Sequence, residues 1–401
     1  MNYQNRIVYK INKNIHDIIY TKNIVKSLDR KIIDLKSDKK IIFLYDENIS
    51  TDIIKDILLG LKLTGCKISS KKIKSLKKNK NIKSVLDLIN TFTQLSLTKK
   101  SVVITCGGGV IGDLAGLASC LYKRGLIYIN IPSTMTALVD SCIGGKTGIN
   151  HNKQINLIGT YFHPTNVIIY EKILDSIPER EYISGQAEII KSFIISNKGS
   201  LNFFNSNISK ILNRKKNIIK RLILDSLKIK IEHFINDVFE KNKRLLLNFG
   251  HTFGHAYEMA TDDLIKKDFL RHGEAVSLGI ISEIALSYLE NNNNSQKKKI
   301  YKNLLNIENI LKSLKLPTKL KFQKKIEKRN LYKKIFFYVF QDKKKISNKP
   351  IYINFADKGK LVPKEIENFD NINKVIYYIL NNIDLRTIWL YKNVHKLSLK
   401  I

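Results

Sequence analysis

The chain has 401 residues, more than one ordinary hydrophobic core accommodates, and this length predicts two domains of roughly 150–220 residues each. A content of 43% hydrophobic and 9% aromatic residues excludes global disorder, and the absence of a bilayer-length apolar run or signal-peptide core predicts a cytoplasmic protein with no membrane partner. The net charge of +35 is compatible with nucleic-acid binding, but the lysines are spread over most of the chain without a recognition motif, so we expect no nucleic-acid partner.

The first half of the chain alternates short apolar runs with helical patterns. A helix is expected at 51–63, with Thr51 or Ser50 as its N-cap. Strands are expected at 39–48, 101–109, 126–132 and 167–170. Alternation of this kind predicts an α/β fold with a parallel, doubly wound sheet.

After about residue 181 the pattern becomes mainly helical. Helices are expected at 186–196, 208–235, 274–290 and 296–315, and a single late strand at 352–354. Pro178 is a suitable boundary marker. We therefore predict a nucleotide-binding α/β domain over 1–181 and a mainly α-helical domain over 182–401, and assign no role to the basic stretch 385–401.

A glycine-rich turn follows the strand expected at 101–105. The segment CGGGVIGDLAG places Gly107, Gly109 and Gly112 in the spacing G-x-G-x-x-G, just before a helical pattern. Glycines let a backbone approach a pyrophosphate, and the N-terminus of the following helix attracts its charge. A tight strand–helix turn without a ligand is the alternative. Asp113 would be a helix cap or a cofactor contact.

Histidines and a carboxylate form a candidate metal constellation. His251 and His255 are four residues apart in NFGHTFGHA and would share one face of a helix, and His272 follows in RHGEAV. Glu188 and Lys191 are three residues apart in GQAEIIK. Two or three histidines with one carboxylate are ligands that zinc accepts, with a position left open for substrate. A structural role is the usual alternative for any one histidine.

Together these motifs resemble the 3-dehydroquinate synthase family. The segments that carry the resemblance occur in the family's order over roughly 40–355: GGGVIGDLAG, RG (124–125), PSTMTALVDSCIGGKTGINH, NLIG, GQAEIIK, NFGHTFGHA, HGEAV and DKK (342–344). The resemblance implies a Rossmann-like domain followed by an α-helical metal-binding domain, which agrees with the pattern of elements.

The resemblance also implies roles for individual residues. Zinc or cobalt would be bound by Glu188, His251 and His272, with His255 as the proton-transfer residue. The substrate would be bound or oriented by Asp140, Lys146, Asn156, Lys191, Lys230, Arg244, Asn248 and Lys343, with Arg124 reaching across from the partner subunit of a homodimer. NAD would be bound around Asp46, Lys83, Gly109, Val110, Ile111, Gly112, Asp113, Ser133, Thr134, Lys146 and Ile155.

The reaction implied is the second step of chorismate and aromatic amino-acid biosynthesis in the shikimate pathway. The small-molecule sugar phosphate 3-deoxy-D-arabino-heptulosonate 7-phosphate is transiently oxidised by NAD, loses phosphate by β-elimination, is reduced again and closes by an intramolecular aldol reaction. NAD is regenerated, so the enzyme is a lyase. Lysines and arginines suit a substrate that carries both a carboxylate and a phosphate.

Two positions depart from the family pattern. The family's Gly-Lys-Asn appears as Gln154-Ile155-Asn156, so a lysine is replaced by isoleucine. The family's Asp-Gly-Glu-x-x-Lys appears at residues 78–83 with Lys80 in place of the acidic residue expected on a ribose hydroxyl. Since the metal and proton-transfer positions are retained, we expect weakened NAD binding with the chemistry preserved.

Three other functions remain open at this point. A sibling cyclase such as 2-deoxy-scyllo-inosose synthase would act on a phosphate without the carboxylate, whereas Arg244 and Asn248 favour a carboxylate-bearing substrate. A polyol dehydrogenase would release NADH and would not need the phosphate-binding lysines. A nucleic-acid-binding protein would bind random duplex DNA with a steep dependence on salt.

Overall fold

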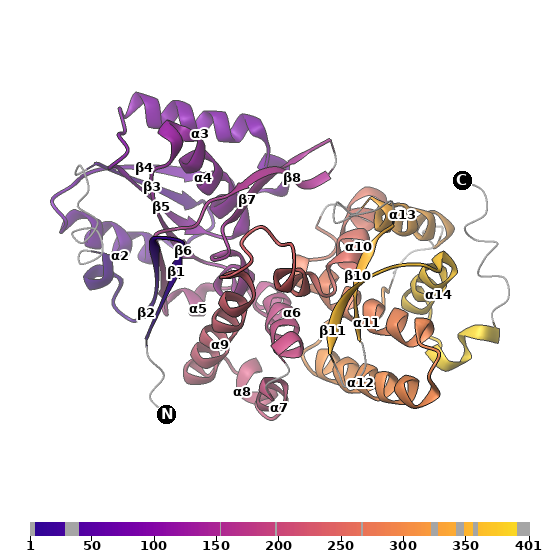
Figure 1. Cartoon of the computed structure of the whole chain (residues 1–401). Coiled ribbons are helices and arrows are strands. Elements are labelled where there is room, and N and C mark those ends of the chain that lie inside the picture. The colour runs from indigo at the N-terminus through magenta and orange to yellow at the C-terminus, as the bar shows by residue number, and fades with distance from the viewer. Residues whose placement is uncertain are drawn as a thin grey trace. The chain divides into compact units, whose positions relative to one another are not determined.

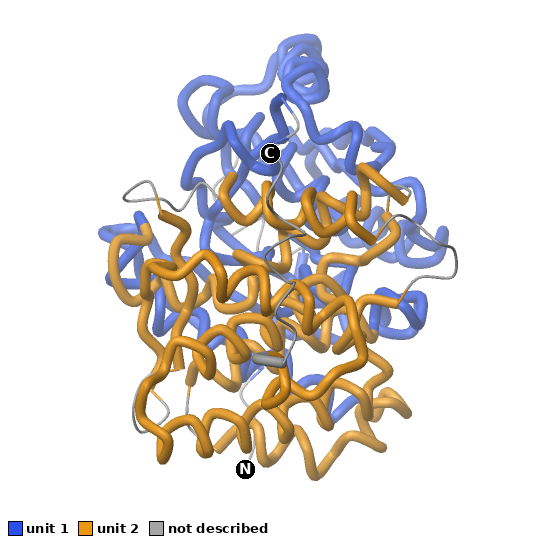
Figure 2. The backbone as a smooth tube through the Cα atoms, turned by 90° about the vertical axis from the view of Figure 1, so that its right-hand side faces the viewer, with its two compact units in different colours: residues 1–182, 216–239 blue, residues 183–215, 240–401 orange. Residues whose placement is uncertain are grey.

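The chain forms two compact units. The computed structural model describes residues 5–28, 40–152, 154–196, 199–265, 268–321, 328–341, 349–355 and 360–390. One unit comprises residues 1–182 and 216–239, and the other comprises 183–215 and 240–401 (Figure 2). The first segment of the first unit ends at residue 182, whereas the domain boundary was expected at 181. Helix α9 (Lys216–Phe234), which lies in the segment expected to belong to the second domain, returns to the first.

The first unit is built on a seven-stranded sheet (Figure 1). In spatial order its strands are β1 (Arg6–Ile11), β2 (Asn14–Thr21), β9 (Asn166–Tyr170), β6 (Ile127–Pro132), β5 (Val102–Gly107), β3 (Lys40–Asp46) and β4 (Lys67–Ile73). Only the β1–β2 pair is antiparallel, so the predicted α/β class with a largely parallel sheet is confirmed. The fully buried sequence of β5, VVITCG, is typical of a strand covered on both faces.

Helices α3 (Ile82–Gln94) and α4 (Gly109–Leu121) cover one face of the sheet (Figure 1). Val85, Leu88 and Phe92 of α3 form a buried core with Leu114 and Ala118 of α4 and the apolar side chains of β3 and β5. Helices α2 (Thr51–Lys62) and α5 (Ile173–Ser176) also belong to this unit. Helix α4 follows β5 directly, which is the strand–turn–helix arrangement that the glycine-rich turn predicted.

The order of the strands places a topological switch point beside β3. From β3 the chain runs to β4 on one side, and later to β5, β6 and β9 on the other. The sheet therefore changes direction between β3 and β5, and parallel sheets bind ligands outside the carboxyl ends of strands at such a switch point.

Several elements lie outside the sequence-based prediction. Strands β1, β2 and β4 were not expected, nor was the hairpin of β7 (Lys146–His151) and β8 (Gln154–Tyr161), which packs on α4. The helix expected over 208–235 is two helices, α8 (Ile208–Leu212) and α9, because Arg214 has a left-handed φ of 50°. The late strand at 352–354 is paired with a further strand, β11 (Leu361–Glu365).

The second unit is mainly helical. It takes most of α6 (Glu179–Ser196) and contains α7 (Ser200–Asn205), α8, α10 (His251–Leu264), α11 (His272–Glu290), α12 (Asn294–Ser313), α13 (Lys328–Phe340), α14 (Phe369–Leu380) and the paired strands β10 (Ile351–Phe355) and β11 (Leu361–Glu365). Helix α11 is buried along most of its length and packs against α10, α12, α14 and β10. Among the described residues, no helix combines the length and apolarity that crossing a bilayer requires.

Glycines bring α11 into backbone contact with its neighbours. A Cβ added at Gly279 would lie 1.8 Å from the carbonyl oxygen of Gly250, and one at Gly273 would lie 1.8 Å from the carbonyl oxygen of Ser184 on α6. No side chain fits at either position, so α6, α10 and α11 are held at a separation that only glycine permits.

We expect Gly279→Ala to destabilise the protein by about 1–3 kcal/mol or more, because the added methyl group must push α11 away from Gly250. Gly112→Ala is the matched control, since a Cβ at this helical glycine would meet no atom closer than 3.8 Å. The measurement is urea unfolding of both variants. Equal stability of the two would show that the α10–α11 contact tolerates a side chain.

Candidate active site

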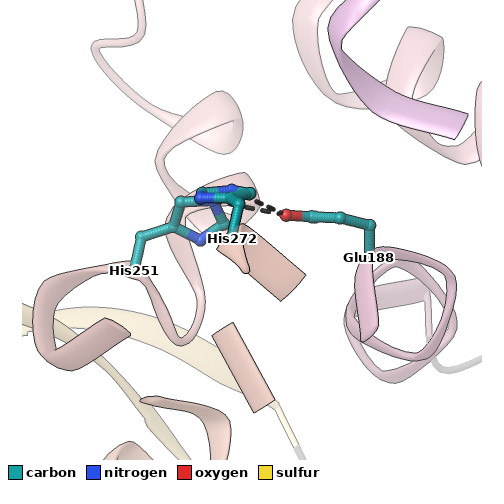
Figure 3. Close-up of side chains that lie close together, drawn as sticks. All are labelled: Glu188, His251 and His272. Carbon is teal, nitrogen blue, oxygen red and sulfur yellow. Dashed lines mark ion pairs between the residues drawn. The ribbon is translucent and has the colours of Figure 1, made fainter. Parts of the chain in front are cut away.

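Glu188, His251 and His272 form a group that fits a divalent metal ion (Figure 3). One ligand atom from each lies within 4.8 Å of the others. Glu188 Oε1 is 3.2 Å from His272 Nε2 and 3.6 Å from His251 Nε2. Tetrahedral zinc with bonds of 2.0–2.1 Å separates its ligand atoms by about 3.3 Å, so these positions match such an ion without large movement. Three protein ligands leave a coordination position for substrate.

The two histidines of this group each begin a helix. His251 follows Gly250, whose φ of 78° turns the chain into α10, and His251 Nδ1 lies 3.1 Å from the carbonyl oxygen of Phe249. His272 is the first residue of α11, whose start is capped by Glu274 Oε2 accepting from the backbone N–H of Arg271 at 2.9 Å. Both Nε2 atoms are thereby directed toward Glu188.

Glu188 is buried on α6, with 1% of its side chain exposed. Lys191, one turn further along and equally buried, places its ammonium 2.5 Å from Glu188 Oε2, as the spacing on one helical face predicted. Burial alone would raise the pKa of Glu188, but Lys191 and His272 outweigh burial and hold that pKa well below its usual range. The carboxylate is therefore ionised and able to bind a cation.

His255 lies beside the metal group without belonging to it. Its ring centroid is 5.3 Å from that of His251 and 5.9 Å from that of His272. The atoms that approach one another closely enough to share an ion come from Glu188, His251 and His272, and not from His255. This arrangement suits a proton-transfer group next to a metal-bound substrate.

Glu258 is a neighbour of the site that the sequence analysis did not identify. Its Oε2 lies 3.3 Å from His272 Nδ1, on the far side of the ring from Glu188. A carboxylate behind a ligating histidine fixes the ring's orientation and strengthens its binding to metal. The signal in the sequence is its position on α10, three residues after His255 and seven after His251, on the same helical face.

Two further residues expected to bind substrate come from the segment of the second unit before α10. Arg244 and Asn248 lie on the 3-10 helix η4 (Lys243–Asn248) and are both buried, and Asn248 Nδ2 donates to Glu240 Oε1 at 2.6 Å. Lys343 lies outside the described residues. A buried guanidinium is a strong point of attraction for a carboxylate or phosphate.

The glycine-rich turn lies at the switch point of the sheet. Asp46 ends β3 and Gly107 ends β5, and a Cβ on Gly107 would lie 3.6 Å from that of Asp46. The backbone N–H of Ser133, after β6, donates to the carbonyl oxygen of Gly107 at 2.9 Å, and Thr134 follows it. The first turn of α4, with Gly109, Val110, Ile111 and Gly112, begins here. Small residues and a helix N-terminus at this edge fit a dinucleotide pyrophosphate.

Two lysine–carboxylate pairs lie in the first unit. Lys80 pairs with Asp113 and also donates to Asn156 Oδ1. Lys230 of α9 places its ammonium 2.8 Å from Asp140 Oδ1 and 2.7 Å from the Asp140 carbonyl oxygen. Asp113 is the fifth residue of α4, so it does not cap the helix, and its contact with a cofactor stays a prediction.

The remaining expected residues of this unit are more accessible. Lys83 at the start of α3, Lys146 at the start of β7 and Arg124 after α4 are exposed, while Ile155 on β8 is half-buried. These three cationic side chains are therefore in contact with solvent. The structure brings Asp46, Ser133 and the glycine turn together. Lys83 lies on α3 and Arg124 on the 3-10 helix that follows α4.

Comparison with known proteins agrees with this geometry. Residues 70–184 match the 3-dehydroquinate synthase N-terminal family, and residues 185–345 match the corresponding C-terminal family. The 3-dehydroquinate synthase of Pelagibacter ubique is 34% identical over 363 residues, covering 88% of this chain and 96% of that protein. That of Dictyoglomus thermophilum is 46% identical over 211 residues, covering 53% of this chain and 58% of that protein.

A solved structure shares the fold. A 2-deoxy-scyllo-inosose synthase complexed with carbaglucose-6-phosphate, NAD+ and Co2+ superposes with a TM-score of 0.79 at 20% identity, covering 94% of this chain and 100% of that one. The likeness extends over both compact units and supports a Rossmann-like first unit and a helical second unit.

We expect Glu258→Ala to lower metal affinity by roughly 10–100-fold, because His272 loses the carboxylate that orients its ring. Glu258→Gln should lose less, since the amide oxygen still accepts from Nδ1. Glu308→Ala is the control, a buried glutamate of the same unit that pairs with Lys312. Metal titration of the apoprotein measures the effect, and unchanged affinity in Glu258→Ala would exclude the role.

We expect His255→Ala to retain its metal and lose turnover by about 10²–10⁴-fold, the usual contribution of a general acid–base group. His251→Ala is the matched comparison, four residues earlier on the same helix, and should lose metal because only two ligands remain. Metal content after dialysis and steady-state rates distinguish the two. Loss of metal from His255→Ala would mean that this histidine is a ligand.

Proposed function

This chain belongs to the 3-dehydroquinate synthase family, and we propose that it converts 3-deoxy-D-arabino-heptulosonate 7-phosphate to 3-dehydroquinate and phosphate. The observation that carries the proposal is the group of Glu188, His251 and His272, placed together from three helices within a chain that matches both halves of the family. The product is the carbocycle on which aromatic amino-acid biosynthesis is built.

The first unit would hold NAD and the second a divalent zinc or cobalt ion. The glycine-rich turn at the sheet's switch point supports the first assignment, and the ligand distances support the second. The similar inosose synthase was solved with NAD+ and Co2+. When bound, NAD supplies a reversible hydride acceptor, and the metal supplies a Lewis acid that polarises substrate oxygens.

The chain's own residues would bind, orient and deprotonate the substrate. His255, beside the metal group, would move the proton that accompanies loss of phosphate. Lys191 keeps Glu188 ionised and would direct any spare N–H of its ammonium to the substrate. Arg244 and Lys146 would bind the carboxylate and phosphate, because cations recognise both groups, and Asn248 would orient the substrate.

We further propose a homodimer in which Arg124 reaches the substrate phosphate of the partner subunit. Arg124 is exposed, and this exposure supports a contact of its guanidinium with a partner chain. We propose the cytoplasm as the compartment, and the four free cysteines, Cys66, Cys106, Cys120 and Cys142, support a reducing environment.

The test is phosphate release from the heptulosonate phosphate by the metal-loaded protein, with and without NAD and with a chelator. We expect release to require NAD, to stop on chelation and to proceed without net accumulation of NADH, since the hydride is returned. Phosphate release that ignores both additives would contradict the mechanism. Sustained NADH production from a polyol would indicate a dehydrogenase instead.

A further inference from the structure

A polar cavity lies at the C-terminal end of α11, in the second unit. Its volume is about 190 Å³, whereas a single water molecule needs only about 10–15 Å³ of such space. Helix α11 runs from His272 to Glu290, so at 1.5 Å per residue its two ends are about 27 Å apart. The metal group lies at the other end, and the cavity is therefore separate from the candidate active site. The residues that line it are Ser287, Glu290, Asn291, Asn292, Asn354 and Lys364.

Strand β10 forms one wall of the cavity and is fixed to α11 by polar contacts (Figure 1). The backbone N–H of Ile353 donates to Glu283 Oε2 at 2.9 Å, and the Tyr352 hydroxyl donates to Glu290 Oε2 at 3.0 Å. Lys364 of β11 lies opposite Tyr352 in the register, so the two side chains share a face of the strand pair. Its ammonium is 3.0 Å from the same Glu290 oxygen. These contacts hold helix and strands at a fixed distance.

Glu290 has one carboxylate oxygen without a donor. Its side chain is only 6% exposed, and its Oε2 accepts from Tyr352 and Lys364. Its Oε1 is buried and has no hydrogen-bond partner in the described part of the chain. Buried carboxylate oxygens are normally satisfied, so an unsatisfied one in the wall of a cavity indicates a ligand that donates to it. The last turn of α11 contains no basic residue, and its free carbonyl groups also favour a positively charged group.

Lys364 sets a second requirement on the ligand. Its ammonium carries three N–H groups, one of which Glu290 accepts. A simple cation would be repelled by this ammonium, and a simple anion would be repelled by the Glu290 carboxylate. A zwitterion satisfies both, because its ammonium can donate to Glu290 Oε1 while its carboxylate accepts from Lys364. All the lining residues are polar, with the amides of Asn292 and Asn354 among them, so a polar ligand fits best.

We propose that this cavity is a second binding site, which takes a small polar zwitterion of the size of an α-amino acid. Glu290 and the C-terminus of α11 bind the ammonium group, Lys364 binds the carboxylate, and the asparagine amides bind the polar side chain. The proposal goes beyond the proposed function and does not depend on it. A ligand at this site also joins β10 and β11 to α11, the helix that begins with His272.

The test is equilibrium dialysis of the full-length, metal-loaded protein with isotopically labelled L-serine. Ethanolamine is serine without its carboxylate, and 3-hydroxypropionate is serine without its ammonium group. We expect L-serine to bind with a dissociation constant of about 1 mM or lower, and each comparison compound to compete at least about tenfold more weakly, because it leaves one charge of the site unmatched. Ethanolamine that competes as well as unlabelled serine would indicate a simple cation site and overturn the proposal.

Variants of the cavity wall locate the bound serine. Glu290→Gln and Lys364→Met should each weaken binding at least about tenfold, since each removes one of the two charges that the ligand matches. Glu367→Gln and Lys360→Met are the matched controls, because both residues are exposed and neither lines the cavity. Serine binding that is unchanged in both wall variants would place the ligand elsewhere and contradict the proposal.

Metal removal separates this site from the metal group, since amino acids also bind metal ions. Chelation should leave serine binding unchanged, and loss of binding on chelation would overturn the proposal, as would no binding to the parent protein at about 10 mM. If Glu290→Gln fails to fold, Lys364→Met and the comparison compounds on the parent protein still decide the outcome. A protein that binds serine here but releases no phosphate would refute the proposed function and leave this site established.

Discussion

The buried charge of Glu188 is the constraint on which the second unit depends. A carboxylate that is 1% exposed costs several kcal/mol unless charged or polar partners surround it. Lys191 supplies one partner from the same helix, and two imidazoles supply the others from the starts of α10 and α11. Three helices must therefore approach one point, and the glycine contacts of α11 allow that approach. A site of this kind is preorganised, because the ligands are held by packing before any ion arrives.

The first unit also pairs its carboxylates with cations, although these carboxylates are less buried than Glu188. Asp113 is neutralised by Lys80 and Asp140 by Lys230, and in both pairs the lysine comes from a different element than the carboxylate. The net charge of +35 does not indicate which lysines form specific contacts. Most lysines are solvated, whereas Lys80, Lys191 and Lys230 are largely removed from water and paired. Burial and pairing, and not abundance, distinguish these three lysines from the rest.

Local signals predicted the elements that depend on local chemistry. The β-branched run before Gly107 and the helical pattern after it fixed the strand–turn–helix unit, and the i, i+4 spacing placed His251 and His255 on one helix. Strands β1 and β2 were missed because the two residues that join them, Asn12 and Lys13, lack the glycine that marks a tight hairpin turn in a sequence.

Contacts between distant segments were beyond the sequence patterns alone. Glu188 and His251 are separated by 63 residues, so their approach depends on the packing of α6 and α10, and only resemblance to a family joined them. The partners of Lys80 and the position of Glu258 behind His272 have the same origin. Each depends on how separate elements pack, and only for Glu258 does the sequence carry a sign, the helical face that it shares with His251 and His255.

The return of α9 to the first unit has a consequence for synthesis and folding. Phe234 of α9 packs edge-on against the ring of Tyr9 on β1, 5.8 Å between centroids, and Lys230 pairs with Asp140. The segment 216–239 must therefore be synthesised before the N-terminal strands can complete their core. A fragment that ends at residue 182 would lack α9, which would expose the ring of Tyr9 to which Phe234 packs and remove Lys230 from Asp140. The first unit can therefore be completed only after residues 183–215 of the second unit have been synthesised.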